Sequence, residues 1–273
     1  MVNKRNNLPN FVCIGAQRAG TTWLYECLRE HPGVFLPDTK ELHFFNKHFD
    51  QGLAAYMQHF SSADCSKKIC GEVTPNYYHD ELALSRMAQV LPDAKIIFIV
   101  REPVSRAYSH YQLSIDNQCK GMTFKEALSA RPIIKELSFQ GKYLEKVYEL
   151  YSVRHVHVGL YDDLQESPAR FYEEVLRFLG VDYDFTPSSL GKRVNRIVFP
   201  GVQKALRGAG LAPLVDLVKE TPIGNAIKAR YNARGRFENS NALYGELFAE
   251  DVNKLEKLIK RDLSSWKLTN QRS

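Results

Sequence analysis

The sequence lacks any apolar run long enough to span a membrane. None of its stretches approaches the roughly 18–20 consecutive apolar residues that a membrane-crossing helix requires. The N-terminal residues MVNKRNNLPN carry positive charge, but no apolar segment follows them as it would in a secretory signal peptide. We therefore expect a protein without a membrane span that resides in the cytoplasm.

Cysteine is scarce, and its spacing indicates no framework. The chain has 5 cysteines, none of them in a Cys-x-x-Cys pair, whereas disulfide frameworks and zinc sites use closer, paired spacings. Its 8 histidines are scattered, and His155 and His157 alternate with valines as they would in a strand. We expect reduced, mostly buried thiols and a function that requires no metal.

A large excess of charge of one sign is also missing. The 37 Lys and Arg residues against 31 Asp and Glu residues give a formal net charge of only +6. The aromatic residues are not interleaved with basic ones as they are on an RNA-binding face. We expect no nucleic-acid partner, and the modest positive charge suits a small anionic ligand instead.

The chain has no internal repeat or low-complexity tract; short apolar runs alternate with amphipathic stretches instead. This alternation is typical of βα units around a parallel sheet. We predict a single α/β domain over residues 1–273, with a central parallel sheet flanked by helices. The expected strands cover residues 10–16, 68–74, 94–102 and 154–164, and the expected helices cover residues 22–30, 81–90, 104–117, 142–151 and 168–179.

The pattern weakens after Gly180. Residues 182–241 are rich in Pro, Gly, Asn and Arg and predict an irregular lid or layer on the acceptor side of the molecule. Regular helical spacing returns near the C-terminus, where we expect one closing helix over residues 243–266. The apolar residues that share one face of this helix are Leu247, Val252, Leu255, Ile259 and Leu263.

The stretch GAQRAGTTW, which begins at Gly15, has the spacing of a phosphate-binding loop without its lysine. A strand, a glycine-containing loop and a helix N-terminus together make an anion site, because backbone N–H groups point at the ligand. In a nucleotide triphosphatase a lysine follows the second glycine, but Thr21 stands there, and the nearby cation is Arg18. The loop therefore suits a terminal monophosphate-like group, although a purely structural glycine turn would have the same pattern.

A second basic stretch, REPVSRAYSHY, follows the strongest predicted strand. Ligands of open α/β sheets bind at the carboxyl ends of the strands, where Arg101 stands. Ser109 follows on the next predicted helix, three residues after Arg106. Arg101 and Ser109 would hold a second phosphate, separate from the first. By itself this stretch fits a solvated helix that carries incidental arginines better than it fits a phosphate site.

These two stretches resemble the sulfotransferases that use 3′-phosphoadenosine 5′-phosphosulfate (PAPS). QRAGTTW is similar to the family's 5′-phosphosulfate loop, Pro-Lys-Ser-Gly-Thr-Thr-Trp, and REPVSRAYSHY fits its 3′-phosphate motif RxPxxRxxSxY. The stretches GLYDDLQESPARFYEEVLRFLGV and LEKLIKRDLSSW also resemble family segments. The resemblance implies a P-loop-like sulfotransferase fold and PAPS as co-substrate. It implies that the 5′-phosphosulfate is bound by Arg18, Ala19, Gly20, Thr21 and Thr22.

Other nucleotide contacts follow from the same resemblance. Arg101 and Ser109 would bind the 3′-phosphate, and Trp23 would pack against the adenine or fill the core. The Arg-Lys-Gly motif of the phenol and steroid branch is absent, and Arg193, next to Lys192, is a partial substitute for it.

The segment TKELHFFN resembles the Lys-Glu-x-His-Phe-Phe segment of the heparan-type and related bacterial sulfotransferases. The resemblance implies that Glu41 is the general base and that His43 orients the base or the acceptor. Two positions depart from the family: Arg18 replaces a lysine, and Val73 in GEVTPNYY occupies the position of another. Lys40 could supply the second cation.

The implied reaction transfers a sulfuryl group from PAPS, without a metal, to a hydroxyl or to an amine or guanidine nitrogen. The acceptor would be a carbohydrate or a small-molecule natural product, and the residues do not decide between them. Two alternatives remain: a P-loop kinase that uses ATP and Mg²⁺, and a non-catalytic module that binds 3′,5′-nucleotides.

Overall fold

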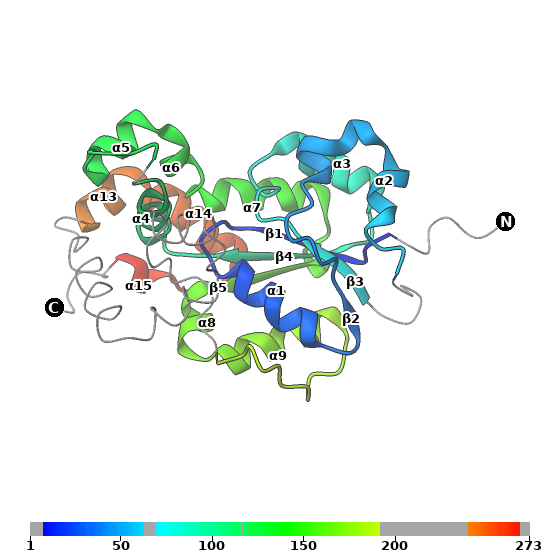
Figure 1. The fold of residues 1–273 in the computed structure, drawn as a ribbon. Helices are drawn as coiled ribbons and strands as arrows, with labels where there is room; N and C mark the ends of the chain where they lie inside the picture. Colours follow the sequence, from blue (N-terminus) through cyan, green and yellow to red (C-terminus); the bar gives the residue numbers. More distant parts are fainter. Residues whose placement is uncertain (1–7, 63–68, 116, 192–239, 268–273) are drawn as a thin grey trace, which may run out of the picture.

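The structure is a computed structural model that describes residues 8–62, 69–115, 117–191 and 240–267. Its centre is a parallel sheet of 5 strands in the order β2-β3-β1-β4-β5. Figure 1 shows this sheet nearly edge-on between two layers of helices. The strands are β1 (Phe11–Gly15), β2 (Val34–Phe35), β3 (Ile69–Val73), β4 (Lys95–Val100) and β5 (Val156–Leu160).

Helices cover both faces of the sheet and extend beyond the end of β4. One face carries α1 (Thr21–Glu30), α8 (Tyr161–Glu166) and α9 (Pro168–Leu179), and the other carries α2 (Leu53–Gln58), α3 (Glu81–Val90) and α7 (Gln140–Leu150). The helices α4 (Pro103–Ser114), α5 (Phe124–Ala130) and α6 (Pro132–Glu136) follow β4. Shorter turns cover Phe44–His48 (π-helix), Phe49–Gln51 and Val153–His155 (both 3₁₀).

The predicted α/β architecture with a central parallel sheet is confirmed. Every residue of β1 is buried, and so is all of β4 after its first residue, because helices pack on both faces of these central strands. Both termini of α9 lie where the sequence predicts them: the Ser167 side chain accepts from the Arg170 amide, and Gly180 follows in the left-handed conformation at φ 78°. Strand β2 was not expected, since it is only 2 residues long.

The single C-terminal helix expected over residues 243–266 is wrong. The segment forms α13 (Ser240–Leu247), α14 (Ala249–Ile259) and α15 (Ser264–Lys267). The first break lies at Phe248, whose ring is buried against Phe139 at 5.4 Å between centroids. The second lies at Lys260, which adopts a left-handed conformation at φ 53° that ends α14. Tertiary packing at Phe248 therefore overrides a continuous helical spacing.

Two other expectations have different outcomes. Cys13, Cys27 and Cys119 are free and buried, as predicted, but Cys70 is disulfide-bonded, so the expectation that all five thiols are reduced is wrong.

Most of the expected lid, at residues 192–239, lies outside the described residues. Within the described residues, no helix is long and apolar enough to cross a membrane. The cytoplasmic location stays a prediction, and a disulfide does not favour it.

Candidate active site

Three neighbouring strands bring the predicted site residues to one edge of the sheet. β1 lies between β3 and β4, so the segments that follow these strands leave the sheet side by side. β3 pairs with one side of β1, and β4, the next strand along the chain, pairs with the other side. Open α/β sheets bind ligands in the crevice at such a reversal of strand order. The phosphate-binding loop follows β1, Arg101 follows β4, and Glu41 lies beside the end of β3 through its amide, which donates to the Val73 carbonyl at 3.1 Å.

The loop after β1 turns directly into α1. Gly20 precedes the helix at φ 91°, a conformation that glycine adopts without steric cost. The side chains of Leu164 and Tyr161 pack against this glycine. Gly20, the N-cap of α1 in the described part of the chain, has no side chain that could accept a hydrogen bond from the first-turn amides. The first-turn amides are therefore oriented toward the loop, where an anion would satisfy them. Ala19 and Thr21 are buried, whereas Thr22 is partly exposed.

Gly15 has a different role from the one that the loop pattern indicates. It is the last residue of β1, and a Cβ built there would lie 2.5 Å from Cδ1 of Tyr78. Tyr78 is fully buried, and its hydroxyl donates to the Leu137 carbonyl at 2.6 Å. The glycine is thus required by close packing of a core tyrosine on the strand.

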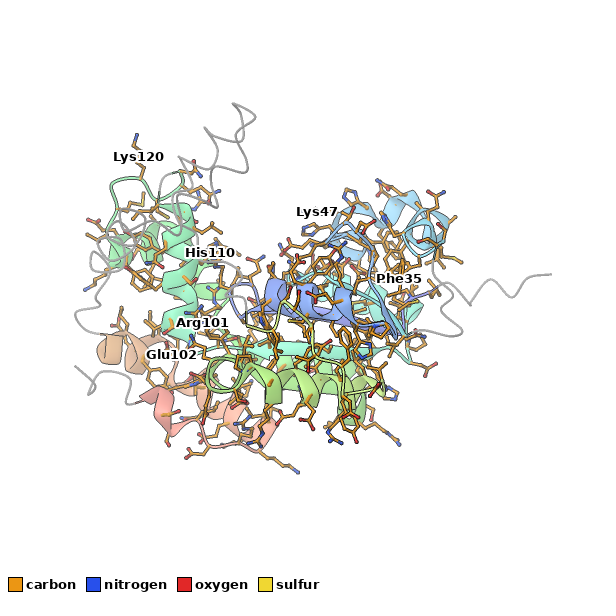
Figure 2. The ribbon with its side chains drawn as sticks, turned by 60° about the horizontal axis from the view of Figure 1, so that its bottom comes forward. Phe35, Lys47, Arg101, Glu102, His110 and Lys120 are labelled. Carbon is orange, nitrogen blue, oxygen red and sulfur yellow. The ribbon has the colours of Figure 1, made fainter. Side chains whose placement is uncertain are left out.

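The two predicted anion-binding stretches are in direct contact. The Arg18 side chain donates from Nε to the Ser109 hydroxyl at 3.0 Å, and Arg101 donates from Nη1 to the Arg18 carbonyl at 2.7 Å. Arg18 is itself in a left-handed conformation at φ 70°. Residues from the two stretches therefore line one continuous basic surface rather than two unconnected sites. Figure 2 shows Arg101 and Glu102 at the end of the sheet, and His110 on the α4 side.

Arg101 is held rigidly from three sides. The amide side chain of Gln140 accepts from the Arg101 N–H at 2.9 Å and donates to the Arg101 carbonyl at 2.6 Å. The Arg101 guanidinium lies over the ring of Tyr161, 4.4 Å from its centroid. These contacts fix the backbone and the plane of the guanidinium before any ligand binds.

Burial and mutual repulsion destabilise the positive charge of this surface. Burial lowers the pKa of Arg18, and the nearby Arg101 charge lowers it further. Burial also lowers the pKa of Arg101, and Tyr161 opposes that shift. Two desolvated cations with their side chains close together gain most from a ligand that carries concentrated negative charge. This is the electrostatic requirement of a phosphate site.

Arg106 has a structural role, although the motif places it on the same helix as Ser109. It is fully buried, and it donates to the Ser138 hydroxyl at 2.7 Å and to the Ile134 carbonyl at 2.5 Å. Burial lowers its pKa to about 10. Arg106 thus joins α4 to the α6 region.

Glu41 is paired with two cationic or potentially cationic side chains. The Lys40 ammonium donates to Oε1 of Glu41, and Nε2 of His43 lies 3.7 Å from its Oε2. The Glu41 side chain is 38% exposed and is accessible to an acceptor, while those of Lys40 and His43 are 16% and 17% exposed. Burial lowers the pKa of His43, and the neighbouring Lys47 contributes to the shift.

The charge of Lys40 also acts on β1. It lowers the pKa of the Cys13 thiol, two residues before Gly15, although burial dominates and leaves that pKa raised, at about 12. Lys40 thus contacts Glu41 and acts electrostatically on the strand that leads into the phosphate-binding loop.

Trp23 is largely accounted for by core contacts. It is 5% exposed, and its ring packs edge to face against Phe171 and Tyr172, with centroids at 6.1 and 6.3 Å. Its indole N–H donates to the Leu190 carbonyl at 3.2 Å. These contacts favour the core alternative over adenine packing. Arg193 lies outside the described residues.

One residue that the sequence did not single out is Glu72, the second residue of the GEVTPNYY stretch. It is 1% exposed, and its carboxylate accepts hydrogen bonds from Tyr56 and Thr74 at 2.5 and 2.7 Å. An acidic residue inside a strand whose neighbours are apolar was the available signal, because carboxylates are rarely buried without partners.

Comparisons with known proteins find sulfotransferases among the chain's relatives. The chain is 32% identical over 197 residues to the bifunctional heparan sulfate N-deacetylase/N-sulfotransferase 4 of Mus musculus, a match that covers 64% of this chain and 23% of that protein. It is 30% identical over 183 residues to the human heparan sulfate glucosamine 3-O-sulfotransferase 3B1, covering 64% of this chain and 46% of that one. The matched segments thus span less than half of each of these curated relatives.

Solved structures show the same fold. A sulfotransferase from Alicyclobacillus acidocaldarius superposes with a TM-score of 0.67 at 24% identity, covering 95% of this chain and 99% of that one. The sulfotransferase domain of the Synechococcus PCC 7002 olefin synthase superposes with a TM-score of 0.56 at 16% identity, covering 94% and 96%. Residues 8–266 match the sulfotransferase domain family, and the chain belongs to that family.

Proposed function

We propose that this protein transfers a sulfuryl group from PAPS to a hydroxyl or amine of a carbohydrate acceptor. One observation supports this proposal: the ends of three adjacent strands carry both a rigid basic surface and an accessible carboxylate. The basic surface is formed by Arg18 and Arg101, and the carboxylate belongs to Glu41. A transfer reaction needs both parts: one side that binds an anionic leaving group, and another that accepts a proton.

On the donor side, the amides at the start of α1 and the Arg18 side chain would bind the 5′-phosphosulfate. Arg101 and Ser109 would bind the 3′-phosphate, which ATP lacks. In the ligand-free structure Arg18 donates to Ser109, and a bound nucleotide would replace this contact with phosphate oxygens. Because sulfuryl transfer resembles phosphoryl transfer in having a loose transition state, positioning and neutralisation of the leaving group are the main requirements.

On the acceptor side, Glu41 would take the proton. A bond forms between the acceptor oxygen or nitrogen and sulfur, the bond from sulfur to the 5′-phosphate oxygen breaks, and the electron pair leaves with 3′,5′-adenosine bisphosphate. Lys40 would supply the positive charge that Val73 does not, since its ammonium contacts Glu41. His43, whose pKa is lowered by burial, would be neutral at physiological pH and could orient the acceptor by hydrogen bonding.

A carbohydrate acceptor is supported by the relatives, whose names state that they act on heparan sulfate. A small-molecule natural product that bears a hydroxyl, amine or guanidine nitrogen is the second candidate. The basic surface and the carboxylate do not distinguish between these acceptors, because both chemistries need the same base.

The test is transfer of ³⁵S from labelled PAPS in the presence of EDTA. N-desulfated heparan sulfate, a panel of aminosugars and a panel of small amines, alcohols and guanidines serve as acceptors. Label on a sugar is the expected result, and label on a small metabolite would change the acceptor class. Transfer of ³²P from γ-labelled ATP only with Mg²⁺ would establish a kinase instead. Tight binding of 3′,5′-adenosine bisphosphate without any transfer would establish a binding module.

A further inference from the structure

Glu72 is a buried carboxylate surrounded by hydroxyl groups. Its Oε1 accepts from the Tyr56 hydroxyl at 2.5 Å, its Oε2 accepts from the Thr74 hydroxyl at 2.7 Å, and the Tyr77 hydroxyl lies 3.3 Å from Oε2. Tyr56, Thr74 and Tyr77 are themselves at most 1% exposed. The three hydroxyls come from α2 and from the segment after β3, so a single carboxylate joins two parts of the chain.

No cation offsets this charge in the part of the chain that the structure describes, where Glu72 forms no ion pair. Burying a carboxylate without an opposite charge is unfavourable, and burial raises the pKa of Glu72 to about 7 although the three hydroxyl donors oppose the shift. An apolar residue at this position of β3 would avoid that cost. The carboxylate therefore has to be explained by what its partners hold in place.

Its partners hold the segment that carries Glu41. The Tyr77 hydroxyl accepts from the Phe45 amide at 3.4 Å while it faces Glu72. The Tyr56 ring stacks on Phe44, with centroids 4.4 Å apart and planes inclined by 13°. Phe44 and Phe45 begin the π-helix that follows directly after His43. Each tyrosine thus has its hydroxyl on Glu72 and makes a second contact on this short helix.

The same strand also holds Glu41 itself. Val73, the residue next to Glu72, accepts from the Glu41 amide at 3.1 Å. Glu41 and His43 both have left-handed backbone conformations, with φ of 65° and 54°. Such conformations cost roughly 1–3 kcal/mol each for residues other than glycine, so they persist only where surrounding contacts impose them. The contacts available here come from β3, from the tyrosines that Glu72 organises and from Arg86, which donates to the Phe45 carbonyl at 2.8 Å.

We propose that Glu72 is a positioning residue, which fixes the Glu41–His48 segment through Tyr56 and Tyr77 and thereby holds Glu41 beside the end of β3. This inference rests on the proposed function for the role of Glu41, but the contacts themselves do not. Glu72 is too deeply buried to touch an acceptor, so its effect passes through the two tyrosines.

Hydrogen–deuterium exchange on the Glu72→Gln variant tests the positioning without any acceptor. A glutamine keeps the shape but turns an N–H₂ group toward hydroxyls that now donate, so at least one hydrogen bond is lost. At pH 8 we expect exchange of the Glu41 and Phe45 amides to rise at least tenfold, with no change over residues 15–24. Asp251→Asn is the matched control, because Asp251 is also largely buried and accepts two backbone N–H bonds, but far along the chain at α14.

Tyr77→Phe is the second variant, in case Glu72→Gln does not fold. It removes one hydroxyl and keeps the ring, and we expect it to expose the Phe45 amide alone. Unchanged exchange at Glu41 and Phe45 in Glu72→Gln, or a similar rise in every peptide, would overturn the proposal. If Glu72→Gln does not fold, unchanged exchange of the Phe45 amide in Tyr77→Phe overturns it.

A kinetic readout then separates positioning from general destabilisation. With the acceptor that gives the highest ³⁵S transfer, Glu72→Gln should lower kcat at least tenfold while its Kd for 3′,5′-adenosine bisphosphate stays within twofold of the wild type. Equal losses in kcat and nucleotide affinity would contradict the proposal. If the wild-type protein transfers label to no acceptor, the proposed function fails, whereas the exchange experiment still decides the role of Glu72.

Discussion

The two halves of the candidate site are built in different ways. The nucleotide half uses the backbone of regular elements, the start of α1 and the end of β4, with Arg101 held by Gln140 and Tyr161. The base half lies on an irregular segment, where Glu41 has a left-handed backbone held by contacts from β3. The anion-binding half therefore lies on the ends of regular elements, and the proton-accepting half lies on an irregular segment that β3 holds in place.

This difference predicts how each half responds to mutation. Changes in the nucleotide half should alter affinity for particular phosphates and leave the rest of the site intact. Changes in the base half should alter the rate of transfer, and those that affect its support should also alter stability. Four predictions test that separation, beginning with the largest expected effect.

Glu41→Gln should lower kcat by about 10²–10⁴-fold, the usual contribution of a general base. The amide keeps the size of the side chain but cannot accept a proton, so the acceptor is no longer activated. Affinity for 3′,5′-adenosine bisphosphate, measured by calorimetry, should stay within about threefold, since the side-chain contacts of Glu41 are with Lys40 and His43 and not with Arg18 or Arg101 in the described part of the chain. Asp50→Asn, an exposed change on the same segment, is the control. Undiminished turnover in Glu41→Gln would contradict the assignment of Glu41 as the general base.

The nucleotide half could be predicted from the sequence because its signals are local. A strand, a glycine and a helix start specify the loop after β1, and the apolar run of β4 places Arg101 at its end. The parallel sheet then brings these two ends together. The sequence analysis could not predict that Arg18 donates to Ser109, since the two residues are 91 positions apart and the contact depends on side-chain direction.

The base half could be predicted only in part. The sequence placed Glu41 next to Lys40 and His43, and the structure confirms that these side chains are close. The role of Glu72 was not predictable, because its partners Tyr56 and Tyr77 come from two segments whose meeting no periodicity encodes. For Gly15, the sequence pattern indicates a role in the phosphate site, whereas the structure shows that the packing of Tyr78 on β1 requires a glycine there.

The stability of the wild-type protein should depend on pH through Glu72. Its native pKa is raised to about 7 from an ordinary value of 4.5, so between these values the native state holds a proton that the unfolded state has lost. The contribution of Glu72 to the unfolding free energy therefore falls as pH rises through this window, by up to about 1.4 kcal/mol per pH unit and roughly 3 kcal/mol in total.

Glu72→Gln has no such ionisation, and it isolates this effect. Urea unfolding at pH 5, 6, 7 and 8 should show the variant gaining roughly 3 kcal/mol relative to the wild type as pH rises. Glu149→Gln is the control, since it makes the same change at a side chain that is 56% exposed. Parallel curves for Glu72→Gln and the wild type would contradict the raised pKa, because they would show that Glu72 binds its proton equally well in the native and unfolded states.

Arg101→Ala should weaken binding of 3′,5′-adenosine bisphosphate by about 10–150-fold, corresponding to the 1.5–3 kcal/mol of a hydrogen bond to a charged group. Adenosine 5′-monophosphate, which lacks the 3′-phosphate, should lose no more than about threefold. Calorimetry with both nucleotides gives the comparison, and Arg29→Ala, which removes an exposed ion pair with Asp38, is the control. Equal losses for the two nucleotides would mean that Arg101 acts on the Arg18 loop rather than on the 3′-phosphate.

The smallest effect concerns the contact between Arg18 and Ser109, which lies within the nucleotide half. A double-mutant cycle with Arg18→Lys and Ser109→Ala should give a coupling of about 0.5–1.5 kcal/mol in the unfolding free energy of the ligand-free protein. Lysine keeps the charge but loses the Nε donor that reaches the hydroxyl.

Saturating 3′,5′-adenosine bisphosphate should abolish this coupling, because both side chains then turn to phosphate oxygens and no longer to each other. The charge-conserving change should also leave nucleotide affinity within about tenfold, since a lysine ammonium still neutralises a phosphate. A coupling that persists unchanged in the saturated protein would show that Arg18 and Ser109 face each other and not the nucleotide. The anion-binding surface would then consist of the α1 amides and Arg101.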